Sequence, residues 1–455
     1  MSCSLREKIL QFDSLVPRYT SYPTAPHFQA LEDESLYPDW LKSLPLKSDL
    51  SLYIHIPFCP KLCWYCGCNT KATKQYSPVE DYLHLILQEI DLLSDKLSDG
   101  HVVRHIHFGG GSPTILSPSD FKKVMQKLKS YFCIHPDAEI AIEVDPRGLT
   151  EGKVATYAKE GVNRVSLGVQ DFDSRVLSAI NRPQPFHLSH DACLLLRQYG
   201  INRINFDLLY GLPHQTVKTM EDTLEKVIFL NPDRIALFGY AHVPWMKKHM
   251  RLIDDNALPD SSARFDLFTV GTEKLEAAGY EPLGIDHFAK PEDELVHAAR
   301  IGQLKRNFQG YTSDKSKILI GVGASSIGQL KQGYMQNARD IPSYKKSILA
   351  GKLPAQNFYL FSDDDCLRSS VIERLMCDFK ANIQELCCTH NFPEHYLDHE
   401  VELLGQYEKQ GFLKIDQNGS ISINPAAKSM ARTICSVFDA YIDPENKQPK
   451  HSKAI

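Results

Sequence analysis

Apolar and polar positions alternate in short runs from about residue 50 to about residue 285. Six runs rich in β-branched and aromatic residues span 52–56, 102–108, 139–144, 164–169, 203–209 and 234–240. Successive runs start 25 to 50 residues apart, which leaves room for one crossover helix in each interval. The pattern predicts an α/β fold of repeated βα units. Because a closed barrel needs eight such units, we expect an incomplete (β/α)6, TIM-like barrel, with a doubly wound sheet as the alternative.

Helix start and stop signals fall between these runs. Residues 77–80 (Ser-Pro-Val-Glu) have the form of a capping box and predict a helix through about Lys96. A similar arrangement at 117–120 opens a helix with one apolar stripe, formed by Phe121, Val124, Met125, Leu128 and Phe132. A long helix over about 262–278 is expected to end at Gly279, a residue suited to a left-handed cap.

The pattern changes beyond about residue 355. Helical stretches at about 363–377 and 393–409 precede two alternating runs joined by Asn418-Gly419, a strong hairpin signal. A final helix carries one apolar face, formed by Ala431, Ile434, Val437, Phe438 and Tyr441. We expect a small, mostly helical, winged-helix-like domain over 351–455, packed against a catalytic domain over 49–350. Residues 1–48 form an N-terminal extension, and the polar tail at 443–455 is expected to fray.

The composition is that of an ordinary soluble protein. The chain has 455 residues, of which 43% are hydrophobic and 24% charged, with a formal net charge of −5. Nothing in this balance indicates a nucleic-acid or membrane partner, and no apolar run approaches the ~20 residues that span a bilayer. The N-terminus lacks a continuous apolar region and carries acids, so we expect no signal peptide and a cytoplasmic protein.

The cysteines are unevenly placed. Four of the twelve fall within residues 59–68, directly after the first predicted strand, and we expect the other eight to be ordinary buried thiols. Buried structural thiols have no reason to concentrate in this way, and zinc normally binds two ligand pairs separated by a longer spacer. Closely spaced thiolates are typical of an iron–sulfur cluster. If only three of the four bind, one iron stays open to a substrate or cofactor.

Other polar residues follow the predicted strands, where barrel enzymes build their sites. Glycines 109–111 follow the second strand, where they form either a tight turn or a place for close ligand approach. Glu143 and Asp145 share one face at the end of the third strand, and either one would also serve as a helix cap. His105 and His107 lack a third ligand, so we expect no metal there.

The spacing C-x3-C-x2-C of Cys59, Cys63 and Cys66 after a first βα strand is the signature of radical S-adenosylmethionine (radical SAM) enzymes. Over nearly its whole length the sequence resembles one family of them, the oxygen-independent coproporphyrinogen III oxidases (dehydrogenases). The blocks that carry the resemblance occur in order at 17–28 (PRYTSYPTAPHF), 53–69, 107–114 (HFGGGSPT), 142–147 (IEVDPR), 167–172, 206–213 (FDLLYGLP), 240–244, 284–289, 306–312 (RNFQGYT) and 321–328 (GVGASSIG).

The resemblance implies a set of site residues. Cys59, Cys63 and Cys66 would bind one [4Fe–4S] cluster, and Cys68 would be needed for activity without being a ligand. Two SAM molecules would bind. The first would contact Tyr53, Gly110, Glu143 and Ile327, and the second Tyr65, Gly111, Ser112, Gln170, Arg182, Asp207 and Ala241. Glu143, Phe308 and Gln309 match positions linked to activity.

The resemblance also implies a reaction. The propionates on rings A and B of coproporphyrinogen III would be oxidatively decarboxylated to vinyl groups, giving protoporphyrinogen IX, in a monomer reduced by a flavodoxin- or ferredoxin-type protein. Arg147, Arg182 and Arg306 are candidates for holding the substrate carboxylates. A related haem chaperone and a related radical SAM methyltransferase are the alternatives. Ser112 and Gly239 depart from the commoner family residues, threonine and asparagine.

Overall fold

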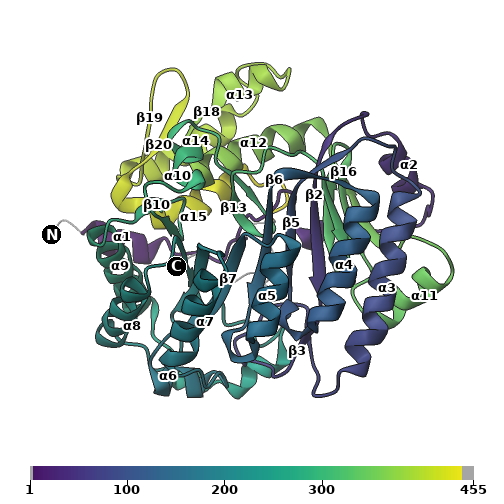
Figure 1. Ribbon diagram of the computed structural model, residues 1–455. Helices are drawn as coiled ribbons and strands as arrows, with labels where there is room; N and C mark the ends of the chain where they lie inside the picture. Colours follow the sequence, from purple (N-terminus) through teal and green to yellow (C-terminus); the bar gives the residue numbers. More distant parts are fainter. Residues whose placement is uncertain (1–3, 443–455) are drawn as a thin grey trace.

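The computed structural model describes residues 4–442, and its centre is a run of seven parallel strands (Figure 1). In sheet order these strands are β14 (Leu319–Val322), β2 (Asp49–Ile56), β5 (Val102–Gly110), β6 (Cys133–Val144), β7 (Arg164–Gln170), β8 (Arg203–Tyr210) and β9 (Arg234–Gly239). The six predicted strands, β2 and β5 to β9, are neighbours in chain order. A doubly wound sheet reverses that order, so the prediction of an incomplete six-unit barrel is confirmed.

Short antiparallel strands extend the sheet at both edges to thirteen strands. Beyond β14 follow β15 (Ile327–Leu330), β16 (Gly333–Asn337), β17 (Ala355–Leu360) and β1 (Gln29–Ala30). Beyond β9 follow β11 (His287–Ala289) and β10 (Glu281–Leu283). Because β9 pairs with β11 on its outer side, the barrel does not close in the described part of the chain. The concave face of the sheet is therefore accessible to a ligand.

Residues of the parallel strands alternate between two environments. Apolar side chains such as Ile54, Phe108 and Val165 point toward the covering helices and form the main core. The intervening positions, such as His107 and Asp207, point into a cavity on the other face. This two-residue period places chemistry and packing on opposite faces of the same strands.

Helices cover the outer face of the sheet in a row (Figure 1). They are α3 (Ser77–Ser94), α4 (Pro118–Tyr131), α5 (Glu151–Glu160), α7 (Phe186–Gln198), α8 (Val217–Leu230) and α9 (Ser261–Ala277). The short helix α6 (Ser174–Ala179) lies apart from this row, in a smaller apolar cluster with Leu209 and Leu212. The predicted cap of α4 is confirmed, since the Ser117 hydroxyl accepts a hydrogen bond from Asp120 N. Gly279, just beyond α9, has the expected positive φ of 88°. The predicted capping box of α3 is wrong, because its N-cap is Tyr76 and Ser77 already lies inside the helix.

The C-terminal region is mostly helical with a small sheet, as predicted. Its helices are α12 (Asp363–Cys377), α13 (Ile383–Thr389), α14 (Asp398–Lys409) and α15 (Ala431–Cys435). Its sheet has the order β18 (Lys380–Asn382), β20 (Ser420–Ile423), β19 (Leu413–Ile415), and the predicted hairpin joins β19 to β20. The final helix is shorter than predicted because a tighter turn over Ser436–Phe438 ends it.

The N-terminal extension contacts both parts of the molecule. It contains α1 (Leu5–Gln11) and α2 (Leu36–Lys42). Ile9, Tyr19 and Tyr22 share one apolar cluster with the C-terminal helices, whereas Trp40 belongs to the main core. The remaining elements are α10 (Glu294–Arg300), α11 (Ile341–Leu349) and two small paired sheets, β3 (Phe58–Cys59) with β4 (Lys71–Ala72) and β12 (Lys305–Asn307) with β13 (Gly310–Thr312).

A buried carboxyl group lies behind β14. Glu89 on α3 accepts hydrogen bonds from Tyr344 Oη at 2.5 Å, from Gly323 N at 2.7 Å and from Asn337 Nδ2 at 2.6 Å. Burial raises the pKa of Glu89 to about 7, although all three hydrogen bonds favour the ionised form. These contacts fix the turn between β14 and β15.

The eleven cysteines within residues 4–442 carry free thiols. Outside the cluster of four, the sequence predicted buried thiols. This is wrong for Cys133 and Cys388, which are exposed, and Cys366 is half-buried. Cys3 and the predicted fraying tail lie outside the described residues. Within the part of the chain that the structure describes, no helix combines the length and apolarity that a membrane span requires.

Candidate active site

The loop that carries the four clustered cysteines is closed at its base. The strands β3 and β4 pair in parallel at the two ends of the loop. Thr73 N donates to Cys59 O at 2.9 Å across this base. The cysteines are therefore confined to a short loop at the carboxyl end of β2, where a barrel site is expected.

Two later segments hold the top of the loop. Asn181 Nδ2 donates to Leu62 O at 2.8 Å, and a hydrogen bond of 2.8 Å joins His249 Nε2 to Cys66 O. These contacts come from the loops after β7 and β9, so residues far apart in the sequence fix one conformation of the cysteine segment.

Hydrogen-bond donors point at two of the sulfur atoms. Thr70 Oγ1 lies 3.3 Å from Cys59 Sγ. Arg182 Nη1 and Arg147 Nη2 lie 3.5 Å and 3.8 Å from Cys63 Sγ. Hydroxyl and guanidinium donors stabilise a thiolate more than a thiol. These donors therefore favour the thiolate form at both sulfur atoms, although at Cys59 burial outweighs the hydrogen bond and raises the pKa to about 11.

The two acids that end β6 have different surroundings. Asp145 caps the turn that follows and forms an ion pair with Arg147 at 2.6 Å, and Arg182 lies 3.6 Å away. Burial alone would raise the pKa of Asp145, but the contacts with these two arginines outweigh burial and lower it. Glu143 instead contacts His107 Nε2 at 3.2 Å and accepts from Gly110 N at 3.3 Å. Asp145 is the cap, and Glu143 is the acid that remains available to a ligand.

The strand β5 reaches Gly110, so Gly109 and Gly110 end this strand instead of following it as predicted, and close packing leaves no room for side chains there. A Cβ atom on Gly110 would meet the His55 ring at 2.7 Å, and one on Gly111 would meet Phe58 O at 2.6 Å. The backbone at 109–111 therefore packs closely against the start of the cysteine loop. Gly110 also has a φ of 113°, which side-chain-bearing residues rarely adopt.

A cavity of about 200 Å³ lies between the cysteine loop and the strand ends. Twelve of the predicted site residues line it: Cys59, Cys63, Tyr65, Cys66, Cys68, Gly110, Gly111, Ser112, Glu143, Gln170, Arg182 and Asp207. Within residues 4–442, no three His, Cys, Asp or Glu side chains are arranged to hold a single metal ion. The ligands of a [4Fe–4S] cluster bind different iron atoms, so they need not converge in that way.

A larger cavity of about 690 Å³ continues from this one along the concave face of the sheet. The two cavities share seven lining residues: Tyr65, Gly67, Cys68, Glu143, Ser166, Gln170 and Asp207. The larger one adds Ala241 from the loop after β9, and Phe308 and Gln309 from the tip of the β12–β13 hairpin. Its volume is in the usual range for small-molecule sites.

Two residues at the shared wall are held in unusual states. Asp207 accepts hydrogen bonds from Ser166 Oγ at 2.7 Å and Asn205 Nδ2 at 2.9 Å, and burial raises its pKa to about 6. Gln170 has a φ of 72°, in the left-handed region that glycine prefers. Strained residues and perturbed carboxyl groups concentrate at functional sites.

Tyr53 and Ile327 line neither cavity. The Tyr53 hydroxyl is hydrogen-bonded to His55 Nδ1 at 3.0 Å, and its ring stacks on His107 at 5.8 Å between centroids. Ile327 lies on β15, paired with Gln336. Tyr53 thus lies beside His107, which contacts Glu143, while the cofactor contacts that the resemblance implies for Tyr53 and Ile327 stay predictions.

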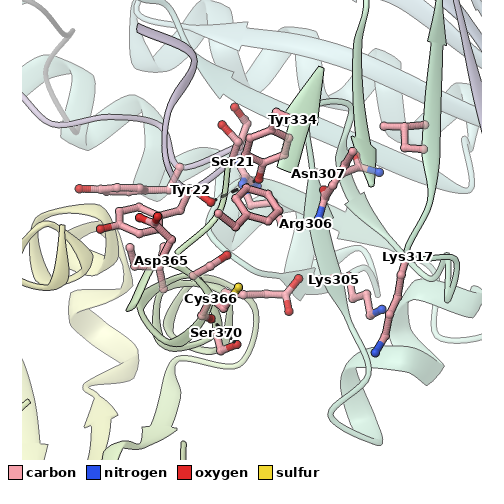
Figure 2. Close-up of a pocket in the computed structure, with 18 of the residues that line it drawn as sticks. Ser21, Tyr22, Lys305, Arg306, Asn307, Lys317, Tyr334, Asp365, Cys366 and Ser370 are labelled. Carbon is pink, nitrogen blue, oxygen red and sulfur yellow. Dashed lines mark hydrogen bonds between the residues drawn. The ribbon is translucent and has the colours of Figure 1, made fainter. Parts of the chain in front are cut away.

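The three arginines proposed for substrate carboxylates have other partners. Arg147 and Arg182 point at Cys63 and Asp145, as described above. Arg306 lines a cavity of about 390 Å³ between the N-terminal segment, the β12–β13 hairpin and α12 (Figure 2). This cavity shares the lining residues Asn307, Thr312, Asp314 and Leu319 with the larger one. Arg306 Nη1 lies 3.8 Å from Asp286 Oδ1, and its guanidinium lies 4.4 Å from the Tyr311 ring centre. Sequence reasoning also missed Thr70 and Ser166, because no motif marks a residue that acts through a hydrogen bond to another.

Gly239, one of the two departures from the family pattern, has a local explanation. A Cβ atom there would lie 2.9 Å from Tyr210 Oη and 3.2 Å from Arg264 Nη2. Any side chain at this position requires both neighbours to move. The absence of a polar side chain is therefore matched by closer packing of Arg264 against the end of β9.

Comparisons with known proteins agree with this geometry. Residues 53–227 match the model of the Radical SAM superfamily. The chain is 43% identical to an oxygen-independent coproporphyrinogen III oxidase of Bradyrhizobium diazoefficiens, with 97% of each chain covered, and 38% identical to one of Helicobacter pylori, with 96% of each covered. The solved structure of coproporphyrinogen III oxidase (HemN) from Escherichia coli, described as a radical SAM enzyme, superposes with a TM-score of 0.89 at 35% identity, covering 94% of this chain and 100% of that one.

The fold, the cysteine loop and the matched segment define a radical SAM enzyme. Its cofactors are accordingly a [4Fe–4S] cluster and S-adenosylmethionine, and the zinc and structural-thiol interpretations no longer apply. Identity of this level over nearly the full length settles the finer assignment: the chain belongs to the oxygen-independent coproporphyrinogen III oxidase family.

The residues present fit these cofactors. Three thiols and their donors are available for the cluster, as described above. The Nε atom of Arg182 is buried beside the smaller cavity and has no hydrogen-bond partner among the described residues. Such an atom is costly unless a ligand satisfies it. The carboxylates of Glu143 and Asp207 in the cavity wall suit the ammonium and hydroxyl groups of S-adenosylmethionine.

Proposed function

We propose that this protein oxidatively decarboxylates the ring A and ring B propionates of coproporphyrinogen III to vinyl groups, giving protoporphyrinogen IX in oxygen-independent porphyrin biosynthesis. One observation carries the proposal. The cysteine loop borders a cavity of about 200 Å³, which shares a wall with a cavity of about 690 Å³. The cluster would therefore lie at the smaller cavity and the substrate in the larger one, next to each other. The full-length similarity to enzymes named for this substrate supports it.

In this proposal Cys59, Cys63 and Cys66 hold the cluster. When bound, the cluster and S-adenosylmethionine supply the one-electron chemistry that removes a hydrogen atom from the propionate β-carbon. Thr70 donates to Cys59 Sγ, and two arginines donate to Cys63 Sγ, which stabilises the thiolate form of both ligands.

The two S-adenosylmethionine sites are proposed on the strand ends. Gly110 and Glu143, with Tyr53 positioning His107, would serve the first site. The second would be lined by Tyr65, Gly111, Ser112, Gln170, Arg182, Asp207 and Ala241. Asp207 carries a negative charge above about pH 6 and would attract the positive sulfonium group.

Cys68, Phe308 and Gln309 are proposed to act at the substrate end. Cys68 lines both cavities, so it lies where cofactor and substrate meet. Phe308 and Gln309 enter the larger cavity at the tip of a hairpin, where Gln309 N donates to Asn307 Oδ1 at 2.9 Å. That contact orients the tip and leaves the Gln309 side chain to the substrate.

The proposal also needs an external one-electron donor for the cluster, and a one-electron acceptor for the electron that the substrate radical loses together with CO2. Lys61 and Asn69, on the cysteine loop, are exposed, so a flavodoxin- or ferredoxin-type protein has access to the cluster from outside. We propose that the protein works in the cytoplasm, because an oxygen-labile cluster with an open iron needs a reducing compartment. We also propose that it is a monomer, as the family resemblance implies.

Anaerobic reconstitution tests the proposal. The reconstituted protein should hold about four iron and four sulfide per chain. With S-adenosylmethionine, a reductant and coproporphyrinogen III, it should release CO2 and form protoporphyrinogen IX. Tight haem binding with unchanged coproporphyrinogen III would instead identify a haem chaperone, and transfer of a methyl group would identify a methyltransferase.

A further inference from the structure

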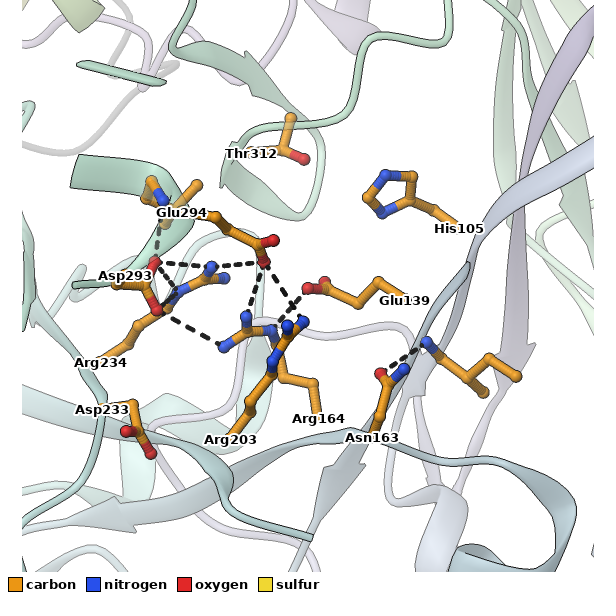
Figure 3. Close-up of polar contacts among 12 residues, drawn as sticks. His105, Glu139, Asn163, Arg164, Arg203, Asp233, Arg234, Asp293, Glu294 and Thr312 are labelled. Atoms are coloured by element: carbon orange, nitrogen blue, oxygen red, sulfur yellow. Dashed lines mark hydrogen bonds and ion pairs between the residues drawn. The ribbon is translucent and has the colours of Figure 1, made fainter. Parts of the chain in front are cut away.

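Among the described residues, three arginines line the larger cavity, and two of them are neutralised. Arg164 and Arg234 lie at the amino ends of β7 and β9 in an ionic cluster (Figure 3). Arg164 contacts Glu139 and Glu294, each at 2.7 Å, and Arg234 contacts Asp293 at 2.8 Å. With Arg203, which lies 3.8 Å from Glu294, the cluster contains three cations and three acids, so its charges are balanced without a ligand.

The third arginine, Arg18, has a different environment. It comes from the N-terminal segment at 17–28 and reaches the cavity wall at the end of β9. Arg18 Nη2 donates to Gly239 O at 2.7 Å, and no carboxylate within residues 4–442 forms an ion pair with it. A guanidinium has five N–H donors, so one carbonyl leaves most of them available.

The acid whose charge acts on Arg18, Asp286, already has other cationic partners. Asp286 is 4% exposed and accepts from Arg432 Nη2 at 3.1 Å, while His287 Nδ1 lies at 2.8 Å and Arg306 Nη1 at 3.8 Å. Burial and the neighbouring charge of Arg432 lower the pKa of Arg18 to about 10, against the attraction of Asp286. Arg18 is therefore a cation at neutral pH.

We propose that Arg18 binds a carboxylate of the ligand in the barrel cavity, namely a propionate of the porphyrinogen. The inference rests on the proposed function, since that substrate carries four carboxylates. The methionine carboxylate of S-adenosylmethionine has the same chemistry, and the test distinguishes the two sources. A propionate that is not being decarboxylated keeps its charge throughout the reaction, so Arg18 would stabilise ground state and transition state equally. Its loss therefore raises KM and leaves kcat unchanged.

The test compares Arg18→Gln, Arg18→Lys and the control Arg6→Gln. Arg6 also ties the N-terminal extension to the barrel, through Asp266 on α9 at 2.8 Å, but it does not line the cavity. For Arg18→Gln we expect KM for coproporphyrinogen III to rise about 10- to 100-fold, the range for losing a charge-assisted hydrogen bond. We expect kcat and KM for S-adenosylmethionine to stay within about twofold, Arg18→Lys to recover part of the affinity, and Arg6→Gln to match the wild type.

A binding measurement provides a readout apart from turnover. Coproporphyrin III and its tetramethyl ester are titrated into the anaerobic holoenzyme and followed by fluorescence. Arg18→Gln should weaken binding of the acid and leave binding of the uncharged ester unchanged. Equal weakening of both would show that the variant disturbs the cavity itself, and would overturn the proposal.

Other outcomes are equally decisive. An unchanged KM for coproporphyrinogen III in Arg18→Gln refutes the proposal, and a rise only in KM for S-adenosylmethionine assigns Arg18 to the cofactor carboxylate instead. A fall in kcat without a change in KM also overturns it. If the wild type itself does not convert coproporphyrinogen III, the proposed function fails, which is distinct from failure of the Arg18 assignment in an active enzyme.

Discussion

Replacing Glu89 by glutamine should remove a pH dependence from the stability of the cluster-free protein. Burial raises the pKa of Glu89 from 4.5 to about 7. Below pH 4.5 the folded and unfolded states both hold the proton, and between pH 4.5 and about 7 only the folded state does. Each rise in pH within this window therefore lowers the free energy of unfolding. Stability from the protonated carboxyl is fully present at low pH and is lost as the pH passes the folded-state pKa.

The magnitude follows from the pKa shift. At about 1.4 kcal/mol per pKa unit, a shift from 4.5 to about 7 amounts to about 3 kcal/mol. Glutamine has no proton to lose in this range and keeps similar size and hydrogen-bonding atoms. The free energy of unfolding of Glu89→Gln, relative to the wild type, should therefore increase by about 3 kcal/mol between pH 4.5 and pH 7.5.

Urea-induced unfolding of the apoprotein, followed by tryptophan fluorescence at several pH values, measures this difference. Glu292→Gln is the matched control, because Glu292 is exposed, and its pH profile should run parallel to that of the wild type. If Glu89→Gln has the same pH profile as the wild type, then Glu89 titrates alike in both states and the reasoning from burial is refuted.

Three further predictions concern the site. Cys68→Ser should keep about four iron per chain and the cluster absorption but lose turnover; loss of iron would show that Cys68 is a ligand. Thr70→Val should retain iron but shift the cluster potential to more negative values by about 20–60 mV, since one hydrogen bond to Cys59 Sγ is lost, and a reductive titration measures this. Burial raises the pKa of Asp207 to about 6, so the affinity for S-adenosylmethionine should rise with pH through this value. Equilibrium dialysis should show that Asp207→Asn binds S-adenosylmethionine more weakly than the wild type and with an affinity that does not change with pH. If the affinity of this variant still changes with pH, another group causes the dependence.

Local signals in the sequence were enough to predict most of the fold. The six parallel strands were found because apolar residues recur with a period of two, and the β19–β20 hairpin because Asn418-Gly419 favours a tight turn. The cap of α3 was misplaced because the same serine suits a cap or a first turn, and only the surrounding packing decides. The strand β18 has three residues and exists because β20 lies beside it, which no local pattern reveals.

Some residues of the candidate site could be predicted from the sequence, and others could not. The cysteines were found from their spacing, and Glu143 because the carboxyl ends of parallel strands meet at one edge, whereas Asp207 was predicted only through the family resemblance. The arginines were not found in this way, since an arginine's partner is set by tertiary contacts. Arg306 forms an ion pair with Asp286. Arg18, which no motif singled out as a cation, lies in the cavity wall and forms no ion pair with a carboxylate among the described residues.

The shared apolar cluster of Ile9, Tyr19 and Tyr22 with the C-terminal helices has a consequence for biosynthesis. During translation the barrel strands leave the ribosome before residues 367–438, so Ile9, Tyr19 and Tyr22 lack this part of their apolar cluster until the chain is almost complete. Arg18 lies between Ile9 and Tyr19 in the sequence. The part of the cavity wall that Arg18 provides is therefore held by this cluster only after the C-terminal helices have been made.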